Sequence, residues 1–294
     1  MPGLSIIGPG RLGGALALAL ERSGYSIETI VYRSFEPARE VASKLLAEPS
    51  LIAFDQLDSL SSPVILIASG DPEIERISAR LADFLTRAQT VLHTSGSLSS
   101  DTLSALRHIG CAVGSMHPLV SISDPVMGSE RFDGAYFCVE GDAAAIKVGT
   151  DLASALGAKP FTIESRFKPL YHAAAVTASG HLVALIDVSI EMLSNCGLSA
   201  VDAKEILMPL IDSTLENLKI QTPDEALTGT FARADSAAFE RHLAAMLEVI
   251  SPDAVEIYLA LAERSLTLAL RRGADKYNIS DLMDRISIAK ANIG

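Results

Sequence analysis

The sequence predicts a doubly wound, mostly parallel α/β domain followed by an all-helical domain. Short apolar runs alternate with helix-like segments in the first half of the chain, whereas only helical spacing continues in the second half. Such alternation is typical of a parallel sheet with crossover helices, and a later run of helices indicates a separate domain. The length of 294 residues also favours two domains over a single hydrophobic core.

Six segments of the first half have the character of buried strands. Glycine, proline or serine residues bound them, and they are apolar almost throughout instead of alternating between apolar and polar residues. Strands that are covered on both faces have this composition. The segments are residues 4–8 (LSIIG), 26–32 (SIETIVY), 63–68 (PVILIA), 90–94 (TVLHT), 112–116 (AVGSM) and 135–140 (AYFCVE).

Helical segments lie between several of these strands and fill the rest of the chain. In the first half we expect helices over residues 11–24, 35–47, 71–85, 99–110 and 142–157. In the second half we expect them over residues 171–196, 200–220, 235–249 and 253–271, with a shorter one after Ser280. The strand pattern stops between Glu164 and Pro169, so we place the two domains at residues 1–164 and 165–294.

The composition excludes some functions. A formal net charge of -12 argues against nucleic acid as a partner, although one or two local cations would suffice for a small anionic ligand. Cys111, Cys138 and Cys196 are well separated and form no CxxC pair, which favours reduced thiols and predicts neither a disulfide framework nor a metal site. The start of the chain lacks a basic segment, so we expect no signal peptide and a cytoplasmic location.

The most apolar segment covers residues 173–190. It contains His181 and Asp187 and has no basic flanks. A membrane span would usually carry few charges and be flanked by basic residues. We therefore expect a buried helix here and no membrane partner.

A glycine pattern follows the first strand. Gly8, Gly10 and Gly13 have G-x-G-x-x-G spacing between a strand and a helix. In this context the first glycine permits a tight turn, the second lets the backbone approach a pyrophosphate, and the third lets the helix pack closely on the strand. The pattern predicts dinucleotide binding by residues 8–13, namely Gly8, Pro9, Gly10, Arg11, Leu12 and Gly13. A tight turn without a ligand is the alternative.

The end of the second strand favours NADP over NAD. Arg33 and Ser34 stand where an NAD site usually has an acidic residue, and they offer a guanidinium group and a hydroxyl to a 2′-phosphate. Glu36 lies nearby, but we expect it on the following helix. The alternative interpretation of Arg33 is a solvated loop residue.

Two further strands end toward the same crevice. The first ends with Ala68, Ser69 and Gly70, which we expect to contact the cofactor, since ligands of open α/β sheets bind beyond the carboxyl ends of the strands. Asp71, followed by Pro72, is expected mainly to cap a helix. The other strand ends with His93, Thr94 and Ser95.

Four motifs together resemble a known family: LHTSGS, GSMHPL, YHAAAVTAS, and EALTG followed by ARAD. The chain is similar to a bacterial family of proposed NADP-dependent oxidoreductases with a Rossmann-like domain and a helical domain of unknown function. It more distantly resembles prephenate dehydrogenase, pyrroline-carboxylate reductase and the hydroxyacid dehydrogenases. The resemblance implies a second domain like the C-terminal domain of 6-phosphogluconate dehydrogenase, which commonly mediates dimerisation, and NADP-linked hydride transfer.

The resemblance also indicates catalytic residues. The His-Pro element of prephenate dehydrogenases corresponds to His117 and Pro118, and their active-site serine corresponds to Ser95. An imidazole with an ordinary pKa near 6.5 can exchange protons at neutral pH, so His117 is the expected general acid or base, with Ser95 bonded to it or to the substrate. Alternatively, His117 only satisfies backbone carbonyl groups at a strand end.

The first helix of the second domain carries further candidates. Lys168, His172 and Ser179 are spaced to share one helical face. Related dehydrogenases use a lysine and an asparagine from such a helix to hold and protonate the substrate, which marks Lys168 and His172 as catalytic candidates and Ser179 as a substrate contact. The asparagine that the family usually has is Gly180 here, so one amide is lost. Packing beside Tyr171 is the alternative role of His172.

Residues 222–235 form the last candidate segment. The resemblance implies that this segment, which includes Thr228 and Thr230, closes over the substrate, either from the same subunit or from a partner subunit. Arg233 is a suitable anchor for a substrate carboxylate, because its guanidinium group matches two oxygens. The alternative is that Arg233 forms an ion pair with Asp235 on the surface. The usual Arg-Gly-Asp is Arg-Ala-Asp in this chain, so a turn that depends on glycine is expected to differ.

Three functions fit the sequence. The leading one is an NADPH-dependent reductase of a small carbonyl, imine or hydroxy acid. The alternatives are a non-catalytic dinucleotide-binding sensor or scaffold, which Gly180 favours, and a deazaflavin–NADP oxidoreductase. The apolar residues within 173–190 and 255–270 also predict a homodimer formed by the helical domain.

Overall fold

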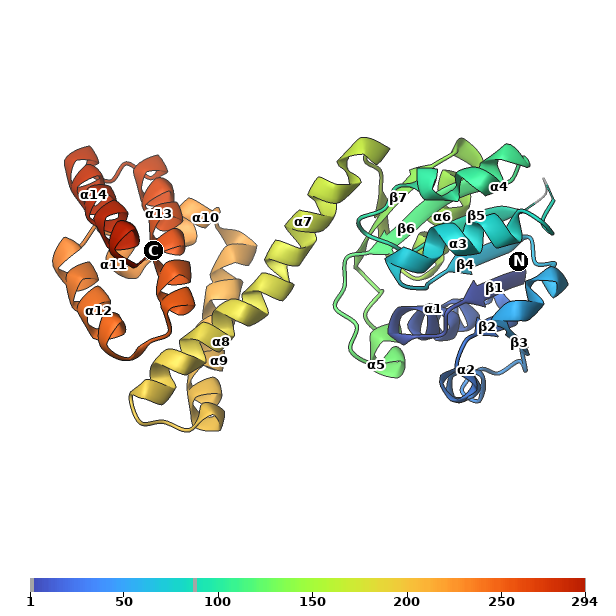
Figure 1. Cartoon of the computed structure of the whole chain (residues 1–294), viewed down its shortest axis with the longest axis horizontal. Coiled ribbons are helices and arrows are strands. Elements are labelled where there is room, and N and C mark those ends of the chain that lie inside the picture. The colour runs from blue at the N-terminus through green and yellow to red at the C-terminus, as the bar shows by residue number, and fades with distance from the viewer. Residues whose placement is uncertain (1–2, 87–88, 294) are drawn as a thin grey trace. The chain divides into compact units, whose positions relative to one another are not determined.

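The computed structural model describes residues 3–86 and 89–293. The chain divides into two compact units, Met1–Ser179 and Gly180–Gly294. The first contains a sheet with flanking helices and the second contains helices (Figure 1). Each unit is described by itself below.

The first unit is built on an eight-stranded sheet with the order β3-β2-β1-β4-β5-β6-β7-β8. Neighbouring strands are parallel except β6 and β7, which are antiparallel. The strands are β1 (Gly3–Ile7), β2 (Ser26–Tyr32), β3 (Ser50–Ala53), β4 (Val64–Ile67), β5 (Thr90–His93), β6 (Ala112–Pro118), β7 (Tyr136–Gly141) and β8 (Lys159–Phe161). The prediction of a mostly parallel, doubly wound sheet is confirmed.

Helices cover both faces of this sheet. The helices of the first unit are α1 (Arg11–Arg22), α2 (Phe35–Ala42), α3 (Asp71–Leu81), α4 (Ser104–His108), α5 (Pro125–Ser129), α6 (Ala143–Ala155) and α7 (Lys168–Ala178), of which α7 packs on neither face; the short 3-10 turns are η1 (Phe54–Ser59), η2 (Ser100–Leu103) and η3 (Ser165–Phe167). Alternate strand residues enter different cores: Leu66 packs in the core that includes α1 and α6, whereas Ile65 packs in the core that includes α3. Burying one such side chain contributes on the order of 2 kcal/mol, so both faces contribute to stability.

Two strands were not predicted, and both lie at the edges of the sheet. Residues of β3 and β8 are partly exposed, and Pro160 of β8 has no backbone N–H to donate to a neighbouring strand. Edge strands can be short and half-polar and can contain proline because one side makes no ladder. They therefore lack the continuous apolar pattern by which the six inner strands were recognised.

The second unit is helical throughout its regular elements. Its helices are α8 (Gly180–Asn195), α9 (Ala200–Ile220), α10 (Pro223–Ala226), α11 (Gly229–Ala232), α12 (Ser236–Val249), α13 (Pro252–Arg271) and α14 (Lys276–Ile293). Buried residues of α12, α13 and α14 form its core. Two differences from the prediction are that α14 begins before Ser280 and that single turns α10 and α11 occupy the segment expected to be a loop.

The units divide later than the end of the strand pattern. Helix α7 belongs to the first unit, because the Lys168 side chain at its start is fully buried and its Nζ donates a hydrogen bond to the carbonyl oxygen of Ser95 at 3.0 Å. The division falls at Ser179, whose backbone (φ -121°, ψ -72°) ends the helix.

The expectation of a buried apolar helix is wrong for the single chain. Within Ser165–Asn195 the most apolar window has a mean hydropathy of 1.6, but only 6% of it is buried. By length and composition this stretch could cross a membrane, which is weak evidence when it comes from one helix. Its apolar side chains are largely uncovered because α7 and α8 contribute little to the core of either unit.

Candidate active site

The glycine turn between β1 and α1 has the geometry of an anion site. Gly8 has a φ of +93°, which side chains disfavour, and its amide donates to the carbonyl oxygen of Val31 at 3.0 Å. A Cβ on Gly13 would collide with the Gly8 carbonyl, so close packing requires glycine there. Gly10 caps α1 without a side-chain hydrogen bond, and a Cβ built on it meets no atom of the described residues within 4 Å. The space beside Gly10, at the start of α1, is therefore open.

A cavity of about 320 Å³ begins at this turn. Its lining includes most of the predicted cofactor residues, together with Phe54 and Glu73, which were not predicted. The predicted residues that line it are Gly8, Pro9, Gly10, Arg33, Ser34, Ala68, Ser69 and Gly70. Arg11 and Leu12 instead line a second cavity of about 410 Å³, and Gly13 packs closely against the Gly8 carbonyl group. Ala68, Ser69 and Gly70 border both cavities, so the two adjoin.

Arg33 is not a free loop residue. Its guanidinium group forms an ion pair with Glu73 at the start of α3, and its Cζ lies 5.6 Å from the centroid of the Phe54 ring. Ser34 is the N-cap of α2, but its hydroxyl makes no capping bond. Glu36 lies in α2, as predicted, and pairs with Arg39.

The second cavity ends at His117. This residue is near the end of β6, and its Nδ1 lies 2.7 Å from the Tyr171 hydroxyl oxygen on α7. The ring centroid of His172 is 5.8 Å from that of His117. Lys168 joins the same cluster through the Ser95 carbonyl oxygen. The structure therefore brings together the predicted catalytic residues His117, Ser95, His172 and Lys168, and it adds Tyr171.

Burial changes the protonation of this cluster. Burial, followed by the nearby charge of Lys168, lowers the pKa of His117 to about 4. The expectation that His117 titrates near neutral pH is therefore wrong, because the imidazole stays neutral there. Burial also lowers the pKa of Lys168 and raises the pKa of the Tyr171 hydroxyl, so Tyr171 retains its proton.

Within the described residues Ser95 is not bonded to His117, and Asp71 has a role other than the expected cap. The Ser95 hydroxyl accepts hydrogen bonds from the amides of Ser97 (3.2 Å) and Leu98 (3.0 Å), and it makes no bond to His117 among the described residues. Asp71 does not cap α3, because Gly70 is the N-cap. The Asp71 carboxylate instead accepts a hydrogen bond of 2.6 Å from the Ser97 hydroxyl, which ties the two loops that border the second cavity.

His93 fixes the loop that carries Ser95. Its Nδ1 accepts a hydrogen bond from the Ser95 amide at 3.2 Å, so its Nε2 carries the proton and donates to the Ser99 carbonyl oxygen at 3.1 Å. Burial lowers the pKa of this imidazole to about 4. His93 is fully buried and therefore acts as a neutral clamp on the loop.

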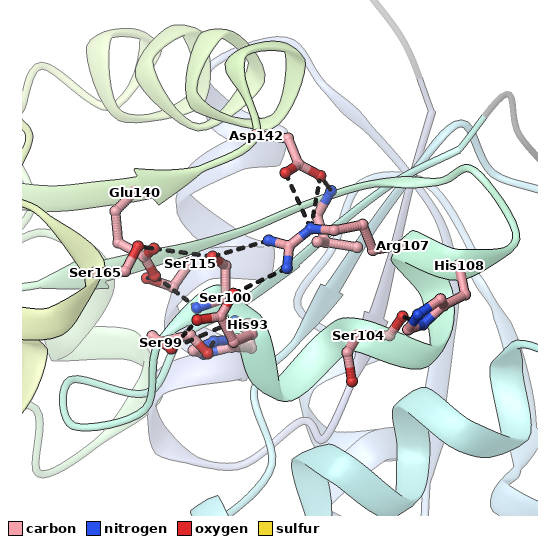
Figure 2. Close-up of polar contacts among 12 residues, drawn as sticks. His93, Ser99, Ser100, Ser104, Arg107, His108, Ser115, Glu140, Asp142 and Ser165 are labelled. Carbon is pink, nitrogen blue, oxygen red and sulfur yellow. Dashed lines mark hydrogen bonds and ion pairs between the residues drawn. The ribbon is translucent and has the colours of Figure 1, made fainter.

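Glu140 connects that loop to the start of α7 (Figure 2). Its buried carboxylate accepts hydrogen bonds from the Ser100 amide (2.8 Å) and from the hydroxyls of Ser100 (2.9 Å), Ser115 (2.7 Å) and Ser165 (2.6 Å). These bonds outweigh burial and lower the pKa of Glu140, which keeps it ionised. Glu140 was not predicted as a site residue, although a carboxylate that ends an otherwise apolar strand was a usable signal.

The predicted substrate contacts Thr228 and Arg233 lie in the second unit, and Ser179 ends the first. Arg233 forms no ion pair with Asp235 in the part of the chain that the structure describes; Asp235 instead caps α12 by accepting from the Ala238 amide at 2.9 Å. Ala234, which stands where the family usually has glycine, adopts a φ of +50°, in the left-handed region that favours glycine. The left-handed backbone costs an alanine roughly 1 kcal/mol.

Family models match both parts of the chain. A Rossmann-like domain matches residues 3–118, and a domain of unknown function, DUF2520, matches residues 135–265. The chain therefore combines a Rossmann-like domain with a DUF2520 helical domain, which is the combination that the sequence motifs indicated. No curated protein matches the sequence.

Solved structures share this fold over nearly the whole chain. A proposed NADP oxidoreductase from Bacteroides fragilis has a TM-score of 0.73 at 21% identity, covering 90% of this chain and 98% of that one. The protein TM1727 from Thermotoga maritima has a TM-score of 0.72 at 23% identity, covering 92% and 99%. Plasmodium falciparum pyrroline carboxylate reductase, solved with NADP bound, has a TM-score of 0.57 at 14% identity, covering 91% and 98%. The resemblance to pyrroline-carboxylate reductases and prephenate dehydrogenase is thus confirmed at the level of fold.

Proposed function

We propose that the chain is an NADP(H)-dependent oxidoreductase that transfers hydride between the nicotinamide and a small carbonyl, imine or hydroxy-acid substrate. The observation that carries this proposal is the adjoining pair of cavities. One begins at the glycine turn and Arg33, the other ends at His117, and they share Ala68, Ser69 and Gly70. The arrangement suits an extended dinucleotide with its reactive ring near the histidine.

The chain's residues fit the parts of such a cofactor. The start of α1, with open space beside Gly10, suits the pyrophosphate, and Arg33 with Ser34 suits a 2′-phosphate. When bound, the nicotinamide supplies or accepts the hydride. The protein's task is then to orient the substrate and to provide or accept a proton.

His117 is the proposed hydrogen-bond donor to the reacting atom of the substrate. Tyr171 keeps its proton and can donate it in a hydrogen bond to Nδ1 of His117, which leaves the proton of the neutral ring on Nε2. That Nε2–H can donate a hydrogen bond to the substrate oxygen or nitrogen as it gains negative charge, while the imidazole stays neutral. Lys168 contributes a nearby positive charge and fixes the Ser95 loop, and His172 lies against the His117 ring.

Substrate contacts are proposed for Ser179, Thr228 and Arg233. The guanidinium group of Arg233 matches the two oxygens of a carboxylate. Replacing Arg233 with alanine should raise the KM for a carboxylate-bearing substrate without changing the Kd for NADPH. An unchanged KM would remove Arg233 from the site.

The first test is ligand-dependent stability. Thermal unfolding with NADPH, NADP, NADH and NAD should give the largest shift with the phosphorylated pair, and a ligand at 100 times its Kd adds about 2.7 kcal/mol. NADPH oxidation should then be followed with a panel of keto acids, cyclic imines and hydroxy acids. A chain that is stabilised by none of the four dinucleotides is not a dinucleotide-dependent enzyme.

A non-catalytic dinucleotide-binding sensor or scaffold is the second candidate. Gly180 favours it, since the family's asparagine is missing at this position. Binding of NADPH without turnover of any panel member would favour the sensor. Turnover of any one substrate would favour the enzyme.

We also propose a cytoplasmic homodimer. Helices α8 and α9 expose large apolar side chains, namely Val183, Val201, Ile206, Leu210, Leu218 and Ile220. A second copy would remove these side chains from water, and closed dimers are the commonest oligomers. Light scattering should give the mass of two chains, and a monomer mass at all concentrations would contradict the proposal.

A further inference from the structure

Arg33 already has an anionic partner. Its guanidinium group pairs with the carboxylate of Glu73, and the same Oε2 accepts hydrogen bonds from Arg76 at 3.1 Å (Nε) and 2.5 Å (Nη2). The hydrogen bond from Arg76 and the charge of Arg33 lower the pKa of the Glu73 carboxyl, so it is ionised at neutral pH. Arg33 and Glu73 both line the cavity that begins at the glycine turn.

The surroundings form a platform for an anion. The guanidinium carbons of Arg33, Arg76 and Arg80 lie 5.6, 5.1 and 5.3 Å from the centroid of the Phe54 ring. Phe54 lines the same cavity. Three positive groups gather around one aromatic ring, where each is attracted to the ring, and the Glu73 carboxylate lies against two of them, Arg33 and Arg76.

We propose that Glu73 is a specificity-determining residue that competes with the cofactor's 2′-phosphate for Arg33. A phosphate monoester carries about -1.5 to -2 charges at pH 7, so it cannot share Arg33 with an ionised carboxylate at low cost. Binding of NADP(H) requires the ion pair between Arg33 and Glu73 to break, while the ion pair between Arg76 and Glu73 remains. The inference rests on the proposed function, because it concerns the same cofactor cavity.

Glu73 has the opposite effect on NAD(H). A ribose 2′-hydroxyl can donate a hydrogen bond to a carboxylate, as acidic residues do in NAD sites. Arg33 therefore favours the phosphorylated cofactor and Glu73 favours the unphosphorylated one. The wild-type chain should therefore prefer NADPH over NADH less strongly than Arg33 alone would predict.

The test measures the Kd values of NADPH, NADH, 2′,5′-ADP and 5′-ADP by isothermal titration. Glu73→Gln should tighten NADPH and 2′,5′-ADP about tenfold and leave NADH and 5′-ADP unchanged or slightly weaker. Glu75→Gln is the matched control, because it removes the same charge from an exposed position of α3 that does not line the cavity. The gain should disappear when Arg33→Ala is combined with Glu73→Gln.

Two results would overturn the inference while leaving the proposed function in place. One is that the wild type binds NADPH but Glu73→Gln does not bind NADPH more tightly, or that Glu75→Gln tightens NADPH binding by the same factor. An equal effect of the two variants would show that only the overall charge matters. The other is weaker NADPH binding in Glu73→Gln, which would mean that Glu73 positions Arg33 for the phosphate. If the wild type binds none of the four ligands, the proposed function fails and this inference fails with it.

Discussion

The two cavities of the first unit are built by different means. The cavity at Arg33 is lined by turns that directly follow β1, β2 and β4, and its charged groups are partly exposed. The cavity at His117 depends on buried side chains from β5, β6, β7 and α7, which are far apart in the sequence. The first is a site made by backbone geometry and the second is a site made by side-chain packing.

This difference predicts different responses to perturbation. The first cavity should lose ligand affinity when it is altered, with little change in folding. The second should change both folding and proton transfer, because its groups hold one another in place. The following experiments test this contrast, beginning with the largest expected effect.

Acid should destabilise the chain through its buried histidines. His93 and His117 have pKa values of about 4 in the folded chain, against 6.5 when unfolded. Between these values the unfolded chain binds more protons, so stability present above pH 6.5 is lost as the pH falls toward 4, on the order of 3 kcal/mol per histidine. Denaturant unfolding at several pH values measures this loss.

The control for the acid effect is His117→Asn. This variant should lose about half of the pH dependence between 6.5 and 4 while keeping the part due to His93. The lowered pKa of Glu140 causes loss only below its ordinary value of 4.5, so it does not mimic the effect. A flat stability profile between pH 4 and 6.5 would contradict the burial of the two imidazoles.

His117→Asn should also reduce turnover. Loss of a positioned hydrogen-bond donor to developing charge commonly costs a factor of about 10² to 10³ in rate, whereas the adjoining cofactor cavity is left intact. We therefore expect kcat to fall about 100-fold and the Kd for NADPH to stay within about twofold. Tyr171→Phe should have a smaller effect in the same direction, because it removes only the partner of Nδ1. Equal turnover in His117→Asn would mean that another group makes the hydrogen bond to the reacting atom.

Gly96→Ala should disturb the His117 cavity through packing. A Cβ on Gly96 would lie 2.8 Å from Nε2 and 2.9 Å from Cε1 of His117, and it would also collide with His172. Overpacking of this kind typically costs about 1–3 kcal/mol, so the free energy of unfolding should fall by about 2 kcal/mol. Turnover should fall as well, since both imidazoles must move. An unchanged melting temperature would show that the cluster is looser than its contacts suggest.

The same contrast explains how much the sequence could predict. The glycine turn, Arg33 and the strand ends follow from local spacing, because consecutive residues build them. The partnership of Arg33 with Glu73, the bond between His117 and Tyr171, and the network of Glu140 join residues that are tens of positions apart. Local patterns carry no information on such pairs. The low pKa of His117 was missed for the same reason, since it depends on burial by α7.

Ala234 shows a limit of motif comparison within the second unit. The replacement of the family's glycine predicted a changed turn, yet Ala234 itself has a left-handed backbone, which glycine adopts most easily. Tertiary contacts can hold a strained residue when its cost is only about 1 kcal/mol. A missing glycine therefore indicates strain as readily as it indicates a different conformation.

Gly10→Ala completes the comparison and should have the smallest effect. A Cβ on Gly10 meets no atom within 4 Å, and its backbone (φ -74°, ψ -162°) suits alanine, so stability should stay within about 0.5 kcal/mol. The methyl group would, however, stand where the backbone must approach a pyrophosphate, so NADPH binding should weaken about tenfold. Isothermal titration and thermal unfolding of Gly10→Ala and Gly96→Ala side by side would separate the two kinds of site. Full NADPH affinity in Gly10→Ala would mean that the turn does not hold the pyrophosphate.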